Sequence, residues 1–480
     1  MTQWTRILEE LAGIAGPERF KADPSITAQY AVEGVVPKAV VFPKDTKMVA
    51  ALMQCAFREN LAVAPWGSGT KMALGNPPTR LDLVVCMARM NHMLDVDTAN
   101  LTITVEAGVK FRDVQARLAT EEDRCYLPLE DLKTEAGEFV CSDRSNSGCF
   151  APLDPLFGEK ATMGGVMATN SSGPRRLLYG LPRDLLLGVR FVTPKGEVIG
   201  AGGKTVKNVS GYDISKLMIG AMGSLGILCE MTLKLLPLPE RMETRLFAFD
   251  DFSHAGDFAD AVLATKLLPA ALEVADREIL KELDFKIPDG LGSGAYVAMI
   301  ALEAFDEAVR RMGKDLGAMA AAFKATGKSL VLEERHRLFW LALGDLESSL
   351  LQRCPRLVVL RLNYPLSSWR GVVEVAGKAA AKARLEHSVM CHAGSGVTLL
   401  HLLPDGAVSQ DEAMVETIKT LLDHCCTEGG NLVVQRAPVD LKPALPVWGN
   451  AGQDLPLMKR IRGEVDPSGI MNPGRFFVSI

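Results

Sequence analysis

"ATMGGVMATNSSGPRRLLYG", residues 161–180, sets a Gly-Gly pair among small and turn-forming residues and then brings two arginines and a tyrosine. An earlier stretch, "PWGSGTKMALG" at residues 65–75, has a similar composition. Consecutive backbone N–H groups that no side chain screens bind phosphate oxygens. Neither stretch has the glycine spacing of a Rossmann fingerprint or of a P-loop. We interpret these first and second glycine stretches as phosphate-binding loops of another kind, with plain turns as the alternative.

The composition excludes several classes of function. The chain has 480 residues, 48% of them hydrophobic, which predicts two or three domains. A formal net charge of -5 gives no electrostatic basis for binding nucleic acid. The N-terminus is typical of a short amphipathic helix, and we find no run of eighteen apolar residues. We expect a cytoplasmic protein that has no nucleic-acid partner and does not insert directly into a membrane.

The ten cysteines are scattered, without the repeated C-x-x-C runs that bind zinc or iron–sulfur clusters. Most are expected to be small core residues. Cys425 and Cys426 are neighbours in an expected helix, so they should point to different faces. Cys141 and Cys149 belong to a polar stretch, residues 131–150, that we interpret as an inserted surface loop, and we expect both to be more exposed.

Hydrophobic periodicity predicts a change of architecture near residue 240. Before it, a β-α-β unit leads into the first glycine stretch, and later strands alternate with short helices. After it, strands and longer helices follow an α+β pattern, which suggests a separate cap domain. The expected helices cover residues 45–59, 111–120, 252–266, 305–326, 331–352 and 409–427.

A series of motifs, taken in order, resembles one protein family. The series is "PWGSGTK", "LTITVEAGV", "PLDP", "ATMGG", "NSSGPRRLLYGLPRD", "GGKTVKNVSGYDISKL", "GSLGI" and "DPSGIMNPGRF". It resembles the FAD-linked oxidases of the vanillyl-alcohol oxidase and p-cresol methylhydroxylase superfamily, and most of all the glycolate oxidase and D-lactate dehydrogenase group. The resemblance implies an α+β fold with a two-subdomain FAD-binding domain, a cap and a C-terminal segment that returns to the flavin, over residues 1–238, 239–430 and 431–480.

The resemblance also implies which residues hold FAD. The amides of both glycine stretches would approach the pyrophosphate, which side chains would crowd out. The family positions correspond to Pro65, Trp66, Gly67, Ser68, Gly69, Thr70, Lys71, Pro152, Asp154, Thr162, Gly164, Gly165, Ala168, Ser171, Gly173, Gly223, Ile227 and Asn472. Arg175 and Arg183 are candidate phosphate partners, or ion-pair partners of acids such as Asp184. Because the first glycine stretch has no His or Cys, we expect noncovalent FAD.

Oxidation of a 2-hydroxy acid needs a base for the hydroxyl proton and a cation for the carboxylate. Catalytic members of the family use a metal held by a His-x-Gly-Asp-Gly-Asn motif, a second histidine seven residues on, and a glutamate that precedes another histidine. Here His392 matches the first histidine, but Ser395 and Leu399 replace the aspartate and the second histidine. His401 lies two residues later, on the same strand face.

The glutamate and the last histidine of that pattern are replaced by Gln435 and Arg436. An amide and a guanidinium make a poor divalent site, so we predict no metal. Two hypotheses remain for the function. The first is a 2-hydroxy-acid dehydrogenase with His392 or His401 as base and Arg361 or Arg436 as carboxylate ligand. Alternatively, His392 is an ordinary strand histidine and Arg436 an ion-pair partner.

The second hypothesis rests on "VVQRAP", followed by "PVWG", which resembles the FAD-binding accessory subunit of bacterial glycolate oxidase. That subunit also lacks the metal set, so the chain would be a non-catalytic or electron-transfer subunit. Under both hypotheses the chain itself has no iron–sulfur motif to accept electrons. We therefore expect an iron–sulfur or electron-transferring flavoprotein partner, with residues 131–150 as its candidate docking surface.

Overall fold

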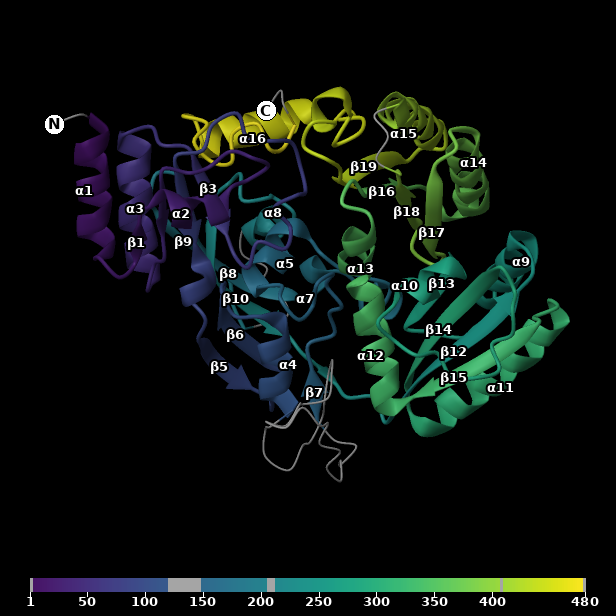
Figure 1. The fold of residues 1–480 in the computed structure, drawn as a ribbon. Coiled ribbons are helices and arrows are strands. Elements are labelled where there is room, and N and C mark those ends of the chain that lie inside the picture. The colour runs from purple at the N-terminus through teal and green to yellow at the C-terminus, as the bar shows by residue number, and fades with distance from the viewer. Residues whose placement is uncertain (1–2, 120–147, 205–211, 406–408, 478–480) are drawn as a thin grey trace.

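The computed structural model describes residues 3–119, 148–204, 212–405 and 409–477. Its elements form two regions, the N-terminal region from α1 to β11 and the C-terminal region from β12 to β19 (Figure 1). Two helices, α12 and α13, lie between the two regions in this view. None of the helices in these described ranges is long and apolar enough to cross a lipid bilayer.

The N-terminal region contains two main sheets that share one hydrophobic core. The first has the strand order β1, β2, β4, β3, with β2, β4 and β3 parallel, and comprises Phe20–Lys21, Ala39–Val41, Leu83–Cys86 and Val63–Trp66. The second is antiparallel in the order β5, β6, β10, β8, β9, and comprises Met93–Asp97, Thr102–Glu106, Ile227–Lys234, Leu186–Val192 and Val198–Gly202.

The helices expected in this region are confirmed. They are α1, α3 and α4, at Gln3–Ala15, Thr46–Arg58 and Phe111–Ala119. Asp45 caps α3 by accepting a hydrogen bond from the Met48 amide at 2.8 Å. The second glycine stretch is more regular than a loop, since it contains α5 and α6, at Met163–Thr169 and Arg176–Tyr179. Shorter helices are α2, α7 and α8, at Pro24–Thr27, Pro182–Leu185 and Ile214–Met218.

The C-terminal region is built on one antiparallel eight-stranded sheet. The strand order is β15, β12, β14, β13, β17, β18, β16, β19, at Gly327–Leu332, Arg241–Phe249, Tyr296–Ala304, Ala271–Asp276, Glu386–His392, Val397–Leu403, Val358–Asn363 and Asn431–Arg436. One face packs on α9, α11, α14 and α15, at Phe252–Leu263, Asp306–Ala322, Trp369–Lys382 and Ser409–Thr427. The other face packs on α10, α12 and α13, at Glu278–Glu282, Glu333–Gly344 and Leu346–Arg353.

The helix expected over residues 331–352 is confirmed over most of its length, but it begins two residues later and is divided into two helices. Residues 327–332 form the edge strand β15, in which buried Ser329 and Val331 alternate with exposed neighbours. Glu333 then takes a positive φ of 48°, which ends the strand. The remaining residues form two helices, α12 and α13, which are separated at Asp345. Pairing with β12 therefore prevails over the helical tendency of this segment.

Most of the expected inserted loop, including Cys141, lies outside the described residues. Its last two residues form β7, Cys149–Phe150, which pairs with β11, Leu236–Pro237. Cys149 is only 2% exposed, so the expectation of an exposed cysteine is wrong at this position. The prediction for the cysteine pair is confirmed, because Cys425 is buried and Cys426 only partly so.

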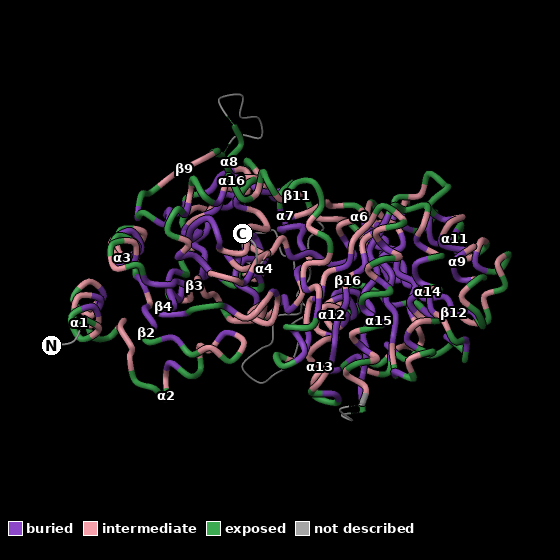
Figure 2. The backbone as a smooth tube through the Cα atoms, turned by 90° about the horizontal axis from the view of Figure 1, so that it is seen from above, coloured by how far each residue is buried: buried purple, intermediate pink, exposed green. Residues whose placement is uncertain are grey.

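The chain returns to the N-terminal region at its C-terminal end. Helix α16, Leu455–Val465, lies across the N-terminal region (Figure 1). Beyond it, Met471 forms a β-bridge with Val63 at the start of β3. Buried segments run through the interiors of both regions, and the exposed ones follow the outer turns and helix faces (Figure 2). The return brings the C-terminal residues next to the first glycine stretch.

Candidate functional site

A cavity that we name the loop pocket measures about 860 Å³, including the open space at its mouth. It lies where the first glycine stretch, α5 and the turn before β10 meet. Most of the predicted cofactor residues line it, namely Pro65, Trp66, Gly67, Ser68, Gly69, Thr70, Lys71, Thr162, Gly164, Gly165, Ala168, Gly223, Ile227 and Asn472. The structure thus brings these residues together around one space.

In the first glycine stretch the backbone itself faces the pocket. The amides of residues 68–71 donate no hydrogen bond to any described residue. Gly69 has a φ of +82°, and a Cβ atom there would lie 2.7 Å from the Trp66 ring. A Cβ atom on Gly67 would lie 2.1 Å from Thr162 Oγ1. Glycine leaves both the space and the free donors that a diphosphate needs.

The second glycine stretch contributes in another way than the sequence suggests. The Gly164 amide donates to the Ala107 carbonyl oxygen at 2.8 Å, so it is not free for a phosphate. A Cβ atom on Gly164 would lie 2.8 Å from Ala107 Cβ. Glycine is therefore required here for close packing of α5 against the end of β6.

Two C-terminal residues complete the loop pocket. Asn472 donates through Nδ2 to the Met222 carbonyl at 2.7 Å, while its Oδ1 is buried without a partner. Arg475 donates through Nη2 to the carbonyls of Met72 and Leu74, at 3.0 and 2.6 Å, and its Nη1 has no hydrogen bond. Burial lowers the pKa of Arg475 to about 10. Arg475 belongs to the motif "NPGRF", but the sequence alone does not place it at the pocket. Its hydrogen bonds to the distant first glycine stretch do.

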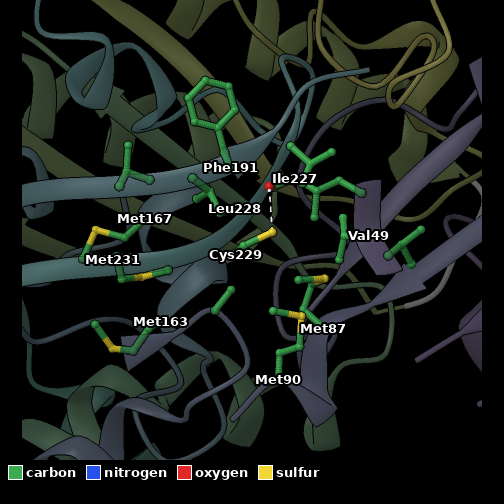
Figure 3. Close-up of a cluster of buried hydrophobic side chains, with 14 of the residues drawn as sticks. Val49, Met87, Met90, Met163, Met167, Phe191, Ile227, Leu228, Cys229 and Met231 are labelled. Atoms are coloured by element: carbon green, nitrogen blue, oxygen red, sulfur yellow. Dashed lines mark hydrogen bonds between the residues drawn. The ribbon is translucent and has the colours of Figure 1, made fainter. Parts of the chain in front are cut away.

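A sulfur-rich core supports the floor of the loop pocket (Figure 3). Met87, Ile227 and Leu228 line the pocket, and Met163 and Met231 pack in the same core. Thioether side chains adapt to irregular shapes, so they suit the underside of a large planar ligand.

The remaining predicted cofactor residues lie elsewhere. Pro152, Asp154, Gly173 and Arg175 do not line the loop pocket, and Ser171 lines a different cavity. The Asp154 carboxylate accepts hydrogen bonds from the amides of Gly173 and Arg175, at 3.0 and 2.7 Å. Burial raises the pKa of Asp154, which the arginine charge and these bonds oppose. Asp154 thus fixes the second glycine stretch and stays outside the pocket.

Arg175 is engaged with the C-terminal region. Its guanidinium donates Nε and Nη2 to the two carboxylate oxygens of Glu303, at 2.8 and 2.6 Å, and the Tyr179 hydroxyl adds a bond of 2.6 Å. Burial alone would raise the pKa of Glu303, but the charge of Arg175 brings it well below its usual range. The structure therefore corrects the interpretation of Arg175 as a phosphate partner, since it forms what we name the Arg175–Glu303 clasp.

Asp184, which the sequence offered as an ion-pair partner of Arg175 or Arg183, caps a short helix instead. Asp184 accepts a hydrogen bond from the Leu181 amide at 2.8 Å, at the start of α7. Arg183 is exposed. Neither residue lines the loop pocket.

A second cavity, which we name the sheet cavity, measures about 710 Å³ including open space. It shares Lys71, Thr169 and Met222 with the loop pocket, so the two spaces adjoin. Its other wall comes from the eight-stranded sheet and the segment after it, with Arg361, Asn363, Val433, Gln435 and Trp448. The cavity therefore lies between the two regions of the molecule.

Unpartnered polar groups gather in the sheet cavity. Four buried oxygen atoms have no hydrogen-bond partner, namely Asn170 Oδ1, Ser171 Oγ, Ser172 Oγ and Gln435 Oε1. Arg361 donates Nε to Asn363 Oδ1 at 3.1 Å and forms no ion pair with any carboxylate in the described part of the chain. Burial, and then the charge of Arg176, lowers the pKa of Arg361 to about 9. A small anion with further polar groups would satisfy this set.

The other predicted catalytic residues do not line either cavity. His392 is buried, and its Nδ1 lies 2.5 Å from Glu273 Oε2. His401 contacts Ser388 Oγ at 3.3 Å, and burial lowers its pKa to about 4. Arg436 is hydrogen bonded to Glu347. Of the predicted catalytic set, only Arg361 faces the sheet cavity.

Burial also decides the charge of the pair formed by His392 and Glu273. Burial, and then the charge of Arg176, lowers the pKa of His392 well below its usual value. Burial raises the pKa of Glu273 well above its usual value. Both shifts favour the neutral forms of the two groups. Within the described ranges, no group of three or more His, Cys, Asp or Glu residues has a geometry that would hold a metal ion.

Comparisons with known proteins agree with this geometry. The model of the FAD binding domain matches residues 37–129 and 143–202, and that of the C-terminal domain of FAD linked oxidases matches residues 238–435 and 442–476. The chain therefore belongs to the FAD-linked oxidases. FAD is its cofactor, and the loop pocket, with its unpaired amides and its buried Asn472 and Arg475, fits that group.

Two relatives are similar to this chain along nearly its whole length. The chain is 26% identical to the "Glycolate oxidase subunit GlcD" of Bacillus subtilis, over 98% of this chain and 96% of the relative. It is also 26% identical to the "D-lactate dehydrogenase" of Archaeoglobus fulgidus, over 98% of each chain. The fold resembles p-cresol methylhydroxylase, with a TM-score of 0.74 at 16% identity over 100% of this chain and 98% of that one. The protein is thus an FAD-dependent oxidoreductase with the p-cresol methylhydroxylase type of fold.

Proposed function

We propose that this chain oxidises a small 2-hydroxy acid to the 2-oxo acid and passes the electrons to a partner protein. The observation that carries the proposal is the sheet cavity, which adjoins the loop pocket and presents Arg361 without a carboxylate partner. A guanidinium recognises a carboxylate through charge-assisted hydrogen bonds. The names of the two relatives, which refer to glycolate and D-lactate, support the same substrate class.

Each part of the site has a role in this proposal. Bound FAD supplies the two-electron oxidant. The amides of residues 68–71 and the Arg475 guanidinium hold its negatively charged diphosphate. Arg361 binds the substrate carboxylate, and the hydroxyls of Ser171 and Ser172 take its remaining polar groups. Because the cavity lies between two packed regions, substrate binding displaces water from around the reacting atoms.

The partner in this proposal is an iron–sulfur or electron-transferring flavoprotein subunit. Support comes from the relative named as a subunit of glycolate oxidase. The docking surface proposed at residues 131–150 lies largely outside the described residues. A deletion that tests it should stop at residue 147, because Cys149 and Phe150 are buried in β7. The shortened chain should keep FAD and lose partner in a pull-down, whereas unchanged recovery of the partner would contradict this surface.

One observation favours the alternative, an FAD-binding accessory subunit without its own catalysis. Neither His392 nor His401 lines a cavity at the site, and the metal ligands of the catalytic pattern are replaced. Such a chain would still bind FAD, but it would not react with an acid by itself.

Anaerobic mixing separates the two functions. The purified chain with FAD is mixed with glycolate, both enantiomers of lactate and longer 2-hydroxy acids, and the visible flavin absorbance is recorded. We expect bleaching by at least one acid, with one enantiomer of lactate as the inactive control. Failure of every acid to bleach the flavin, with normal FAD content, would reject catalysis and support the accessory subunit.

A further inference from the structure

The proposed function requires a base, and the two histidines considered for this role do not reach the substrate side of the site. His392 is bonded to Glu273, and His401 to Ser388. Among the described residues that line the sheet cavity, only Lys71 and Arg361 have side chains that titrate. An arginine stays protonated in proteins, so it cannot accept a proton. The inference below rests on the proposed function and concerns Lys71.

Lys71 occupies the boundary between the two cavities. It follows Thr70 in the first glycine stretch and lines both the loop pocket and the sheet cavity. Its amine makes no hydrogen bond or ion pair with any residue that the structure describes. Its Nζ lies over the Phe157 ring, 5.0 Å from the ring centroid. The amine therefore remains available to a substrate that enters the sheet cavity.

Burial favours the neutral form of Lys71. Glu347 on α13 is hydrogen bonded to Arg436 on β19, and Arg361 lies on β16. Burial lowers the pKa of Lys71 to about 8; the charge of Glu347 opposes this shift, and the charges of Arg436 and then Arg361 add to it. A substantial fraction of the amine is then unprotonated at neutral to mildly alkaline pH. A base of this strength suits proton transfer near neutral pH.

We propose that Lys71 is the base that accepts the hydroxyl proton of the 2-hydroxy acid while Arg361 binds the carboxylate. The substrate C–H bond at C2 breaks, and its hydrogen leaves with both electrons as hydride to FAD. The O–H bond breaks at the same carbon, and its proton goes to the free electron pair of Lys71 Nζ. The C2–O bond becomes a double bond, and the products are the 2-oxo acid, reduced FAD and a lysine ammonium that releases its proton to water.

Two substitutions test the role of the amine. Lys71→Met removes the base, and Lys71→Arg keeps the positive charge but cannot lose its proton. We expect both to slow anaerobic flavin reduction by about 10²- to 10⁴-fold, the usual contribution of a general base. Lys378→Met, at a surface lysine of α14, is the matched control and should react like the unmodified chain.

The pH profile gives a second readout. In the unmodified chain the rate of flavin reduction should rise as pH passes about 8 and then level, because the unprotonated amine is the active form. The residual rate of Lys71→Arg should lack this rise. Binding of a 2-oxo acid, followed by the change in the flavin spectrum, should persist in Lys71→Arg because Arg361 remains. A wild-type rate in Lys71→Arg would overturn the proposal and leave Lys71 with a role as a positive charge only.

A third measurement needs no variant. Acetylation of Lys71 in the chain with FAD bound, quantified by mass spectrometry across pH, should show a midpoint near 8. A midpoint near about 10.4, as for an ordinary lysine, would contradict the base. The two proposals can fail separately. If no acid reduces the flavin of the unmodified chain, both the proposed function and the role of Lys71 as base are rejected. An active chain with a fast Lys71→Arg variant rejects the base alone.

Discussion

The loop pocket and the sheet cavity adjoin, but they are lined by different kinds of chemical groups. The loop pocket is lined mainly by backbone, glycine and apolar side chains of the N-terminal region. The sheet cavity has a mixed lining with a larger polar share, which includes Lys71, Arg361 and four buried oxygens that lack partners. The loop pocket therefore suits a large diphosphate-containing cofactor, and the sheet cavity suits a small anion.

The difference also concerns how each site is encoded. A surface made of backbone needs consecutive glycines, so its residues are close in sequence. A surface made of side chains collects them from wherever strands and helices meet, and the sheet cavity draws on residues 71, 170–172, 361, 363, 433, 435 and 448. This contrast predicts that substitutions will separate cofactor binding from substrate binding, unless they loosen the contact between the regions.

The largest effect is expected where the two regions are joined. Arg175→Met would remove the bidentate ion pair of the buried Glu303 carboxylate and leave the Tyr179 hydroxyl and His336 as its remaining partners, which costs about 3–5 kcal/mol. Urea unfolding followed by circular dichroism should show this loss, and both cofactor and substrate binding should suffer together. Arg310→Met is the matched control, because the ion pair of Arg310 with Asp306 is exposed to solvent and screened by it, so its loss should change the stability little. Equal losses in the two variants would show that the clasp does not join the regions.

The second prediction concerns the sheet cavity alone. Arg361→Gln removes the cation proposed for the substrate carboxylate, so kcat/KM should fall by about 100-fold, or about 3 kcal/mol. The FAD content should be unchanged, because Arg361 does not line the loop pocket. Arg311→Gln, at an exposed position of α11, controls for loss of charge. If Arg361→Gln bound FAD more weakly and kept its kcat/KM per bound flavin, the assignment of the two cavities would be reversed.

The contrast explains which parts of the site could be predicted from the sequence. The residues of the first glycine stretch line one pocket together, and they could be grouped from the sequence because they are neighbours in the chain. Helix α15 was predicted at its observed bounds because its pattern is local. The partner of Arg175 could not be predicted, since Glu303 lies 128 residues further along the chain on β14. The position of Lys71 beside the sheet cavity could not be predicted either, because it depends on how the eight-stranded sheet packs against the first glycine stretch.

The third prediction concerns the loop pocket alone. Gly69→Ala adds a side chain at a φ of +82° and within 2.7 Å of the Trp66 ring, so it should weaken FAD binding by about 1–3 kcal/mol. Titration of the apoprotein with FAD, followed by flavin fluorescence, measures the loss. Gly13→Ala is the control, because a Cβ atom there meets nothing within 4 Å and the residue lies in helix α1. Unchanged FAD affinity in Gly69→Ala would show that the first glycine stretch does not contact the cofactor.

The last prediction is that removal of metal ions has no effect. It concerns His392, which matches the first metal-binding histidine of the family pattern. The Nδ1 of His392 is hydrogen bonded to Glu273, and burial raises the pKa of that carboxyl well above its usual value, which favours its protonated form. A protonated carboxyl is a poor ligand for a divalent ion, and the neighbouring positions of the family pattern hold Ser395, Leu399 and Gln435. Treatment with EDTA followed by dialysis should therefore leave the rate of flavin reduction unchanged, and added zinc or manganese should not increase it. Loss of the rate with EDTA and its return with either metal would mean that the sheet cavity acts through a bound ion, and Lys71 would then no longer be needed as the base.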